Sequence, residues 1–196
     1  MPRVREFDPQ TILADATQIF WRNGYADTSI EVIVSQTGVS RYGLYGTFGN
    51  EKELLIAAIR HYDETMKQLL MTSLQDHEAS LPAIIDYCRT IAEHAKDETF
   101  CAGCLIVNVA VEVAPHDSDV SAEVQRIDRK HQALFTRAIQ NGQMKGEVPT
   151  HIDAEGSALI MVSLTRGLAL MVRAGTVPDT LWPAVNAAQT TLMQKE

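Results

Sequence analysis

The chain has 196 residues, of which 45% are hydrophobic and 21% charged, and its formal net charge is −8. Glycine and proline are scattered, which excludes collagen-like and low-complexity chains, and the hydrophobic share is enough for a folded core. No run of 18 apolar residues occurs, and Met1-Pro2-Arg3 leads into a polar stretch instead of a signal-peptide core. We therefore expect a cytoplasmic protein of one to two domains with no membrane partner.

The negative charge is unevenly distributed along the chain. Residues 1–60 hold six basic and seven acidic residues, net −1, whereas residues 61–196 carry net −7. A near-neutral segment can still bind DNA if its cations converge on one surface, although its affinity for nonspecific DNA should be weak. Arg3 and Arg5, ahead of the first predicted helix, are either a solvated N-terminus or a basic arm that contacts phosphate.

The first predicted helix begins after Asp8, which can cap it, and ends at Asn23 and Gly24. Pro9 suits its first turn. Its apolar stripe comprises Ile12, Leu13, Ala16, Ile19 and Phe20. With the two helices that follow, this helix should form a compact three-helix head.

Residues 28–48 read as two short helices joined by a tight turn. Thr28 with Glu31 is interpreted as a capping box, Gly38 ends the first helix, and Ser40 can cap the next one. Two helices joined by a glycine turn are typical of a helix-turn-helix, but a plain helical hairpin in an all-α protein has the same pattern.

The helix after Ser40 should present a short polar face to solvent. Leu44 and Phe48 recur at i, i+4 spacing and are expected to point inward. The outward residues would be Arg41, Tyr42, Tyr45 and Thr47. Hydroxyls, one guanidinium and two phenols on a helix that follows a glycine turn suit the floor of a DNA major groove.

Asn50 with Glu53 makes a further capping box, and a long amphipathic run follows it. Up to this point the chain resembles the TetR family of bacterial one-component transcriptional repressors. The matching segments are Thr28-Ser29-Ile30, Gly38-Val39-Ser40-Arg41, Leu44-Tyr45, Phe48 and Asn50-Glu51-Lys52-Glu53-Leu54. The chain departs from the family pattern at Tyr42-Gly43 and Gly46-Thr47, so the resemblance does not carry an operator sequence.

Six further helices are predicted from hydrophobic periodicity and from capping and breaking residues. They span residues 51–74, 80–96, 103–113, 117–141, 152–173 and 179–194. Because no useful stretch alternates at period two, the predicted fold class is all-α with about nine helices. The resemblance implies a helix-turn-helix DNA-binding domain at 1–50 and an effector-binding and dimerisation domain at 51–196.

The resemblance also implies a ligand- or redox-responsive repressor that binds a palindromic double-stranded DNA operator as a homodimer and is released by a small-molecule effector. Base edges or the nearby backbone would be contacted by Ser40, Arg41, Tyr42, Gly43, Tyr45 and Thr47. Phosphates would be held by Thr28, Ser29, Thr37 and Lys52. Lys52 has an additional reason, because a helix N-terminus adds its own amide donors.

The last two predicted helices carry apolar residues on more than one face. These residues are Ala158, Leu159, Met161, Val162, Leu164, Thr165, Leu168, Ala169, Met171 and Val172, with Leu181, Trp182, Val185, Ala188 and Leu192. A buried core and a packed homodimer interface both explain the pattern. Because a palindromic site requires a two-fold dimer, the interface is favoured.

Three cysteines occur, and Cys101-Ala-Gly-Cys104 lies at a predicted helix start. Buried structural thiols, a zinc site completed by His94 or His116, and a thioredoxin-type enzyme are possible interpretations, although zinc needs four ligands. The resemblance adds a fourth interpretation, because in some TetR-like regulators the cysteine of a Gly-Cys-Leu segment senses reactive species. That role would carry to Cys104. No metal site and no cofactor are predicted.

The C-terminal domain would also need a cavity for the effector. Eight residues at helical spacing are candidates to line it, each alternatively a core or surface residue. They are Tyr87, Cys104, Asn108, Glu112, His131, Phe135, Met161 and Thr165. No metalloprotease, P-loop, dinucleotide-binding or serine-hydrolase motif occurs, so an enzyme is not predicted. The alternative function is a thiol-dependent redox enzyme that uses Cys101 and Cys104.

Overall fold

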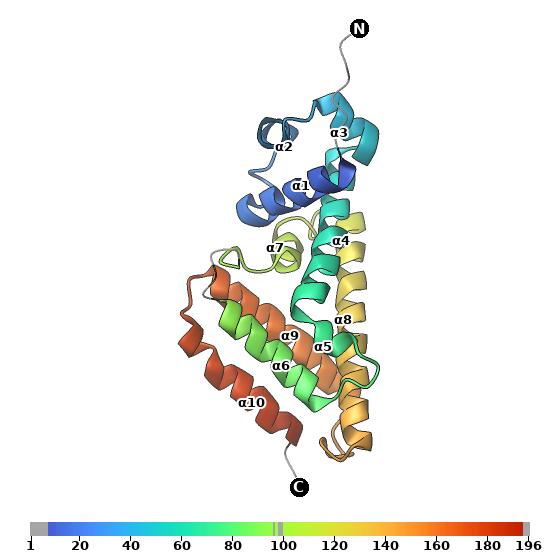
Figure 1. Cartoon of the computed structure of the whole chain (residues 1–196), viewed down its shortest axis with the longest axis vertical. Helices are drawn as coiled ribbons and strands as arrows, with labels where there is room; N and C mark the ends of the chain where they lie inside the picture. Colours follow the sequence, from blue (N-terminus) through green and yellow to red (C-terminus); the bar gives the residue numbers. More distant parts are fainter. Residues whose placement is uncertain (1–7, 96, 98–99, 194–196) are drawn as a thin grey trace.

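The computed structural model describes residues 8–95, 97 and 100–193, and every regular element in these ranges is helical (Figure 1). The elements are α1 (Pro9–Asn23), α2 (Ile30–Thr37), α3 (Arg41–Phe48), α4 (Glu51–Leu70), α5 (Thr72–Gln75), α6 (Leu81–His94), α7 (Leu105–Glu112), α8 (Ser118–Met144), α9 (Ala154–Arg173), the 3-10 turn η1 (Pro178–Thr180) and α10 (Trp182–Met193). The all-α prediction is confirmed. The possible arm at Arg3 and Arg5 lies outside the described residues.

The described ranges contain one α-helix more than predicted. The prediction extended α4 to residue 74, but α4 ends at Leu70. Met71 leaves the helical conformation with φ −112° and ψ 18°, and it is almost fully buried. The single turn α5 follows it, so a buried side chain interrupts what the sequence pattern presents as one continuous helix.

The start of α4 and the end of α2 follow the predicted signals. Asn50 and Glu53 form the predicted capping box: the Asn50 amide donates to Glu53 Oε2 at 2.9 Å, and the Glu53 amide donates to Asn50 Oδ1 at 3.0 Å. Gly38 ends α2 in the left-handed conformation, with φ 71°, which favours glycine. These local signals fix the spacing of the first four helices.

The capping box predicted for α2 is wrong. Ser29 is the N-cap, and its hydroxyl accepts a hydrogen bond from the Val32 amide at 3.4 Å. Thr28 is fully buried, and its hydroxyl donates to the Gly24 carbonyl at 2.6 Å. Thr28 therefore holds the loop between α1 and α2 together instead of capping the helix with Glu31.

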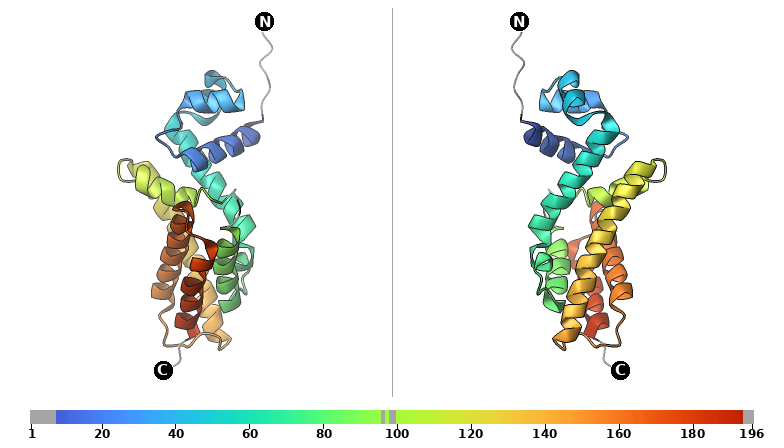
Figure 2. Two further views of the ribbon diagram at one scale, coloured as in Figure 1. Left: turned by 90° about the vertical axis from the view of Figure 1, so that its left-hand side faces the viewer. Right: turned by 90° about the vertical axis from the view of Figure 1, so that its right-hand side faces the viewer.

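The buried apolar residues form two separate clusters. The upper core joins α1, α2 and α3 with the first half of α4, with α7 and with the N-terminal half of α8. The lower core joins α5, α6, the C-terminal half of α8, α9 and α10. In Figures 1 and 2, α4 and α8 run from the level of the head into the lower bundle. Thus α7 packs with the N-terminal three-helix head, although the sequence places it among the later helices.

One described helix, α9, is long and apolar enough to cross a membrane, with a mean hydropathy of 1.4 over its best window. A single such helix is weak evidence, because the core helix of a folded domain passes the same test. About a third of that window, 33%, is buried inside the chain. The remaining apolar surface of α9 therefore needs another explanation.

Candidate nucleic-acid interface and effector cavity

The α3 helix presents the polar face that the sequence predicts. Leu44 is 1% exposed and belongs to the upper core, so the opposite face points into solvent. Tyr42 is 90% exposed and Tyr45 is 42% exposed. Arg41 forms an ion pair with Glu31 of α2, and its Cζ lies 6.0 Å from the centre of the Tyr45 ring. The face thus combines two phenols with a guanidinium that neighbouring side chains already hold in place.

Four other residues assigned to DNA also lie on the outer part of the head. Ser29 and Thr47 are exposed, and Gly43 is half-buried. Ser40 is exposed and caps α3, because its hydroxyl accepts a hydrogen bond from the Gly43 amide at 3.1 Å. The side chain of Ser40 therefore orients the first turn of α3 as well as being available to solvent.

Both threonines assigned to phosphates make hydrogen bonds within the head. The prediction that Thr28 holds a phosphate is wrong, because its side chain is fully buried. Thr37 is half-buried, and its hydroxyl donates to the Ile33 carbonyl at 2.8 Å. Its oxygen also accepts a hydrogen bond from the Val39 amide at 3.4 Å, which holds the turn that leads into α3.

Lys52 is engaged by carboxylates of α8. Its Nζ lies 2.6 Å from Asp119 Oδ2 and 3.4 Å from Asp117 Oδ2. The hydrogen bond to Asp119, followed by the Asp117 carboxylate, raises the pKa of Lys52 above its usual value. In this conformation the ammonium group ties the start of α4 to the start of α8, a connection that the sequence did not predict.

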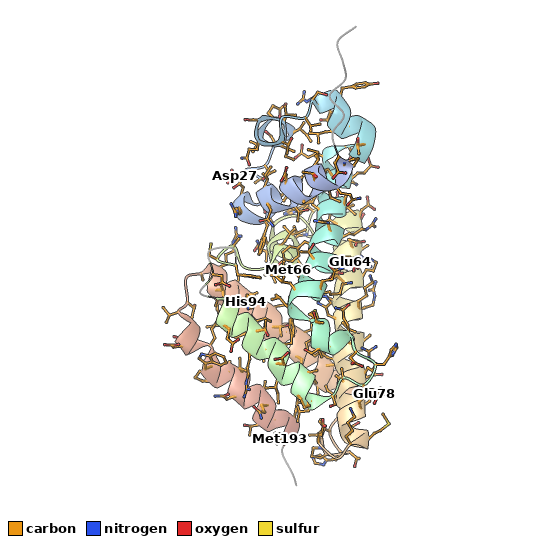
Figure 3. All side chains as sticks on the ribbon, in the orientation of Figure 1. Asp27, Glu64, Met66, Glu78, His94 and Met193 are labelled. Carbon is orange, nitrogen blue, oxygen red and sulfur yellow. The ribbon has the colours of Figure 1, made fainter. Side chains whose placement is uncertain are left out.

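A cavity of about 70 Å³ lies between α4, α6, α8, α9 and the loop before α7. One water needs only about 10–15 Å³ on the same measure. Four of the eight predicted residues line it, namely Tyr87, Cys104, His131 and Thr165. Met66 and His94, both labelled in Figure 3, also line the cavity and mark its position between the head and the lower bundle.

The other four predicted cavity residues lie elsewhere. Phe135 and Met161 are buried in the lower core, and Asn108 donates its side-chain amide to the Ala102 carbonyl at 3.2 Å. Glu112 faces the head, where its carboxylate accepts hydrogen bonds from the loop after α1. These four residues do not line this cavity, because helical spacing alone does not identify the face that a residue occupies.

The cavity has a charged group that sequence reasoning missed. Arg166 of α9 donates from Nη1 to Cys104 Sγ at 3.0 Å and from Nη2 to Asp128 Oδ1 at 2.7 Å. Burial alone would lower the pKa of Arg166, but its interactions with Cys104 and Asp128 outweigh burial and raise the pKa. The available signal was an arginine in the middle of the mostly apolar stretch 157–172 of α9.

Two phenols and a second thiol are buried near this centre. Burial, followed by the neighbouring Cys104, raises the pKa of Tyr62 well above its usual value, and burial also raises the pKa of Tyr87. Burial raises the pKa of Cys88 to about 12, so this thiol stays protonated and unreactive. Cys101 is exposed and Cys104 is intermediate, so the three cysteines occupy three different environments.

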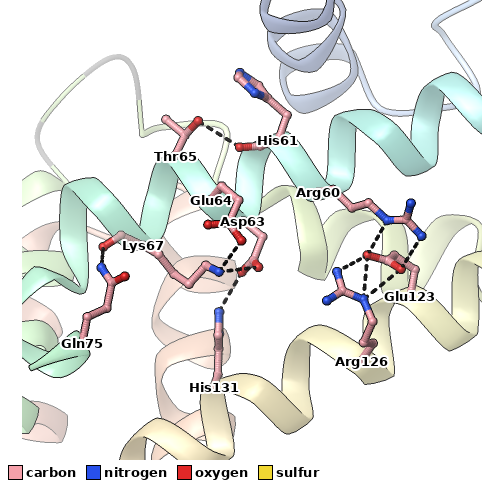
Figure 4. A network of polar contacts seen from close by, with 10 residues as sticks. All are labelled: Arg60, His61, Asp63, Glu64, Thr65, Lys67, Gln75, Glu123, Arg126 and His131. Atoms are coloured by element: carbon pink, nitrogen blue, oxygen red, sulfur yellow. Dashed lines mark hydrogen bonds and ion pairs between the residues drawn. The ribbon is translucent and has the colours of Figure 1, made fainter. Parts of the chain in front are cut away.

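A second polar group lies where α4 meets α8 (Figure 4). Asp63 is nearly fully buried, and its Oδ1 lies 2.9 Å from His131 Nε2, while its Oδ2 lies 3.2 Å from Lys67 Nζ. Burial alone would raise the pKa of Asp63, but His131 and Lys67 outweigh it and lower the pKa. The carboxylate therefore remains charged beside the cavity and fixes the position of His131.

Closer to the head, Glu123 of α8 is held between two arginines, as Figure 4 shows. Arg60 of α4 donates to both of its oxygens at 3.1 Å, and Arg126 donates from Nε at 3.0 and 3.1 Å. The hydrogen bonds from Arg126, followed by those from Arg60, lower the pKa of Glu123 to about 2. This ion network joins α4 to α8 between the head and the cavity.

The surface of α9 is apolar on one side. Leu159, Ile160, Leu170 and Met171 are each about half exposed. We call these four residues the α9 stripe. Apart from its chain neighbours and the backbone of its own helix, no heavy atom of the described residues lies within 4 Å of the position that a Cβ would take at Gly167 of α9. The stripe is thus an unusual concentration of apolar side chains on the surface of the described residues.

Several residues predicted for a dimer interface belong to the chain's own lower core. They are Ala158, Met161, Val162, Leu168, Val172, Leu181, Val185 and Leu192. One face of α9 is therefore part of the chain's own core, and the opposite face is exposed. Among residues 8–95, 97 and 100–193, no group of three or more His, Cys, Asp or Glu side chains could hold a metal ion.

Comparisons with known proteins match both halves of the chain. The family model described as "Tetracyclin repressor-like, C-terminal domain" matches residues 80–188, and the one described as "Bacterial regulatory proteins, tetR family" matches residues 12–58. The chain is 29% identical to the uncharacterized HTH-type transcriptional regulator YezE of Bacillus subtilis (strain 168), over 75% of this chain and 78% of that protein. It is 26% identical to the HTH-type transcriptional repressor ComR of Escherichia coli (strain K12), over 91% of this chain and 86% of that protein.

Solved structures match the whole arrangement of helices. A cysteine mutant of the TetR family transcriptional regulator CifR, complexed with 26-bp double-strand operator DNA, matches with a TM-score of 0.86 and 22% identity, over 97% of this chain and 99% of that chain. The reduced form of E. coli NemR matches with a TM-score of 0.83 and 18% identity, over 95% and 97%. At these identities the likeness shows the fold alone.

Proposed function

Because the chain belongs to the TetR family of bacterial transcriptional regulators, we propose that it is a repressor that binds a palindromic DNA operator as a homodimer. The proposal is carried by the face of α3, where Tyr42 is 90% exposed while Leu44 is 1% exposed. Residues 1–50 would form the DNA-binding domain, and residues 51–196 the effector-binding and dimerisation domain. The family consists of regulators, which argues against the thiol-dependent redox enzyme.

The exposed residues of the head divide into two roles. Bases or the adjoining backbone would be contacted by Ser40, Arg41, Tyr42, Gly43, Tyr45 and Thr47. Ser29, Thr37 and Lys52 would lie near phosphates, which position a protein on DNA without reading its sequence. Lys52 would exchange Asp117 and Asp119 for phosphate on binding, since its ammonium group is only partly buried.

A two-fold dimer would use the α9 stripe. Its four half-exposed apolar side chains would be buried if α9 packed against α9 of a second copy. Symmetric dimers join identical patches in this way. The dimer would present two α3 helices to successive major grooves, about 34–36 Å apart. Light scattering tests this: a particle of the chain mass, 21.7 kDa, at micromolar concentration would contradict the dimer.

The effector would act at the cavity. The protein would meet both the effector and its operator in the cytoplasm. A small molecule would either occupy the cavity or react with Cys104, whose sulfur accepts a hydrogen bond from Arg166 at 3.0 Å. The guanidinium stabilises negative charge that develops on the sulfur, which favours reaction of Cys104 over the deeply buried Cys88. Either event would favour a conformation whose two heads no longer fit successive grooves.

A gel shift with DNA that flanks the protein's own gene tests the proposal. A shift is expected, and its affinity should fall with salt according to a few phosphate contacts per subunit. Binding that does not depend on salt would contradict the assigned interface. Insulin reduction measured on the same sample tests the enzyme alternative, and treatment with a quinone or hypochlorite followed by mass spectrometry shows whether Cys104 reacts.

A further inference from the structure

Glu112, the last residue of α7, binds the DNA-binding head directly. Its Oε2 accepts a hydrogen bond from the Tyr25 amide at 3.0 Å, and its Oε1 accepts one from the Ala26 amide at 2.6 Å. Two successive amides that point at one carboxylate form an anion-binding nest, and hydrogen bonds to a charged acceptor are the stronger kind. The loop is shaped around this carboxylate: Gly24 has φ +84°, and a Cβ there would lie 3.0 Å from Glu112 Oε2.

The loop that Glu112 binds leads directly into the helix-turn-helix. The Thr28 hydroxyl donates to the Gly24 carbonyl at 2.6 Å, and the Thr28 amide donates to the Tyr25 carbonyl at 3.0 Å. The next residue, Ser29, caps α2. Because these bonds make the loop one compact turn, a displacement of Tyr25 relative to α7 moves the start of α2, and α3 with it.

The other end of α7 forms part of the cavity wall. Cys104 is the N-cap of α7, and Gly103, Cys104 and Ile106 line the cavity. Trp21 of α1 donates from Nε1 to the Gly103 carbonyl at 3.0 Å, so the head is also held at this end. Eight helical residues span about 12 Å. The apolar face of α7 is buried in the upper core, which makes the helix a short rigid connection between the cavity and the loop.

We propose that Glu112 positions the DNA-binding head and passes a change at Cys104 to it. A group added to the Cys104 sulfur would displace the N-terminal end of α7 from Arg166 and Trp21. Because α7 is short and stiff, its far end would shift too, and Glu112 would leave the Tyr25 and Ala26 amides. This inference rests on the proposed function, and it adds a second connection to the one that α4 makes between the head and the body.

The experiment uses full-length protein with Cys101→Ser, so that iodoacetamide alkylates Cys104 while Cys88 is protected by burial. The DNA is a duplex that the Cys101→Ser protein selects from a random-sequence library, and fluorescence anisotropy gives the dissociation constant before and after alkylation. Glu112→Ala should weaken binding about tenfold before alkylation and should remove most of the further loss that alkylation causes. Glu112→Gln keeps one acceptor oxygen, so its dissociation constant and its loss of affinity on alkylation should lie between those of the parent and of Glu112→Ala. Glu93→Ala, an exposed glutamate of α6, is the matched control and should change neither value.

Hydrogen exchange at the Tyr25 and Ala26 amides provides a readout that does not need DNA. Both amides should be protected in the thiol form and should lose protection on alkylation and in Glu112→Ala, while the melting temperature of Glu112→Gln stays close to that of the parent. Equal weakening of the parent and of Glu112→Ala by alkylation, or unchanged protection of the two amides after alkylation, would overturn the role of Glu112. If the parent protein binds no duplex, the proposed function fails, and the amide protection still decides whether Glu112 responds to Cys104.

Discussion

The α3 face and the cavity contain the same chemical groups in opposite surroundings. Each has one arginine and two tyrosines: Arg41, Tyr42 and Tyr45 on α3, and Arg166, Tyr62 and Tyr87 around the cavity. The α3 groups are exposed, although Arg41 pairs with Glu31, whereas both tyrosines of the cavity are buried and Arg166 is bound by Cys104 and Asp128. The comparison teaches that surroundings, more than residue type, separate the exposed face of α3 from the buried polar groups of the cavity.

The largest expected effect is on stability. It appears when a tyrosine of the cavity and a tyrosine of the α3 face are each replaced by alanine in separate variants. Tyr62→Ala removes a buried ring that packs edge-on against Trp21 at 5.0 Å between centroids, so the free energy of unfolding should fall by about 3–5 kcal/mol. Tyr42→Ala, at an exposed position, should change it by less than about 0.5 kcal/mol. Urea unfolding of both variants measures the difference, and equal losses would end the distinction between the two places.

The next effect concerns recognition of DNA. Tyr42→Ala should alter sequence preference, with a loss of about 1–3 kcal/mol of discrimination at the base pair that Tyr42 meets. Lys52→Ala should weaken all duplexes alike, because a phosphate contact does not read sequence. Binding of both variants to a set of single-base operator changes measures this. The reverse pattern would overturn the two assignments.

A smaller effect separates the two arginines. Arg166→Met removes the donor to Cys104, so alkylation of this thiol in the Cys101→Ser protein should slow by about tenfold. Arg41→Met should leave that rate unchanged, because Arg41 lies on α3 and binds Glu31. Mass spectrometry over a time course gives both rates. An unchanged rate in Arg166→Met would show that the guanidinium does not assist Cys104.

The smallest effect comes from the ion network between the two regions. The pKa of Glu123 is lowered from 4.5 to about 2 in the folded chain, so its contribution to stability is complete above pH 4.5 and is lost as the pH falls toward 2. Its arginine partners are partly exposed, which limits that contribution to about 1 kcal/mol. Glu123→Gln should therefore flatten the fall in unfolding free energy between pH 4.5 and 2, measured by urea unfolding at each pH.

Most of the fold, and the exposed face of α3, could be predicted from local sequence patterns. The capping box at Asn50, the left-handed glycine at Gly38 and the inward position of Leu44 all depend on residues within one or two turns, which a sequence displays directly. The choice between Thr28 and Ser29 as the cap of α2 depended on the burial of Thr28 and on its hydrogen bond to the Gly24 carbonyl. That kind of information is absent from the spacing of the residues.

The cavity and its link to the head could be predicted only in part, because they depend on contacts between distant segments. Arg166 meets a thiol 62 positions away, and Glu112 meets an amide 87 positions away. Helical periodicity gives the residues that share a face but not the helix that this face meets. Half of the candidates therefore line this cavity, while the contacts of Glu112 and Arg166 emerged only from the three-dimensional arrangement.

The α9 helix lines the cavity with one side and carries the α9 stripe on the other. Arg166, Ala169 and Val172 line the cavity, while the α9 stripe lies on the surface. If two chains pair through that stripe, their cavities are separated by little more than the thickness of two packed helices, each about 10 Å across. Filling one site would then disturb the wall of the other, so the two sites should be coupled and the Hill coefficient should differ from one.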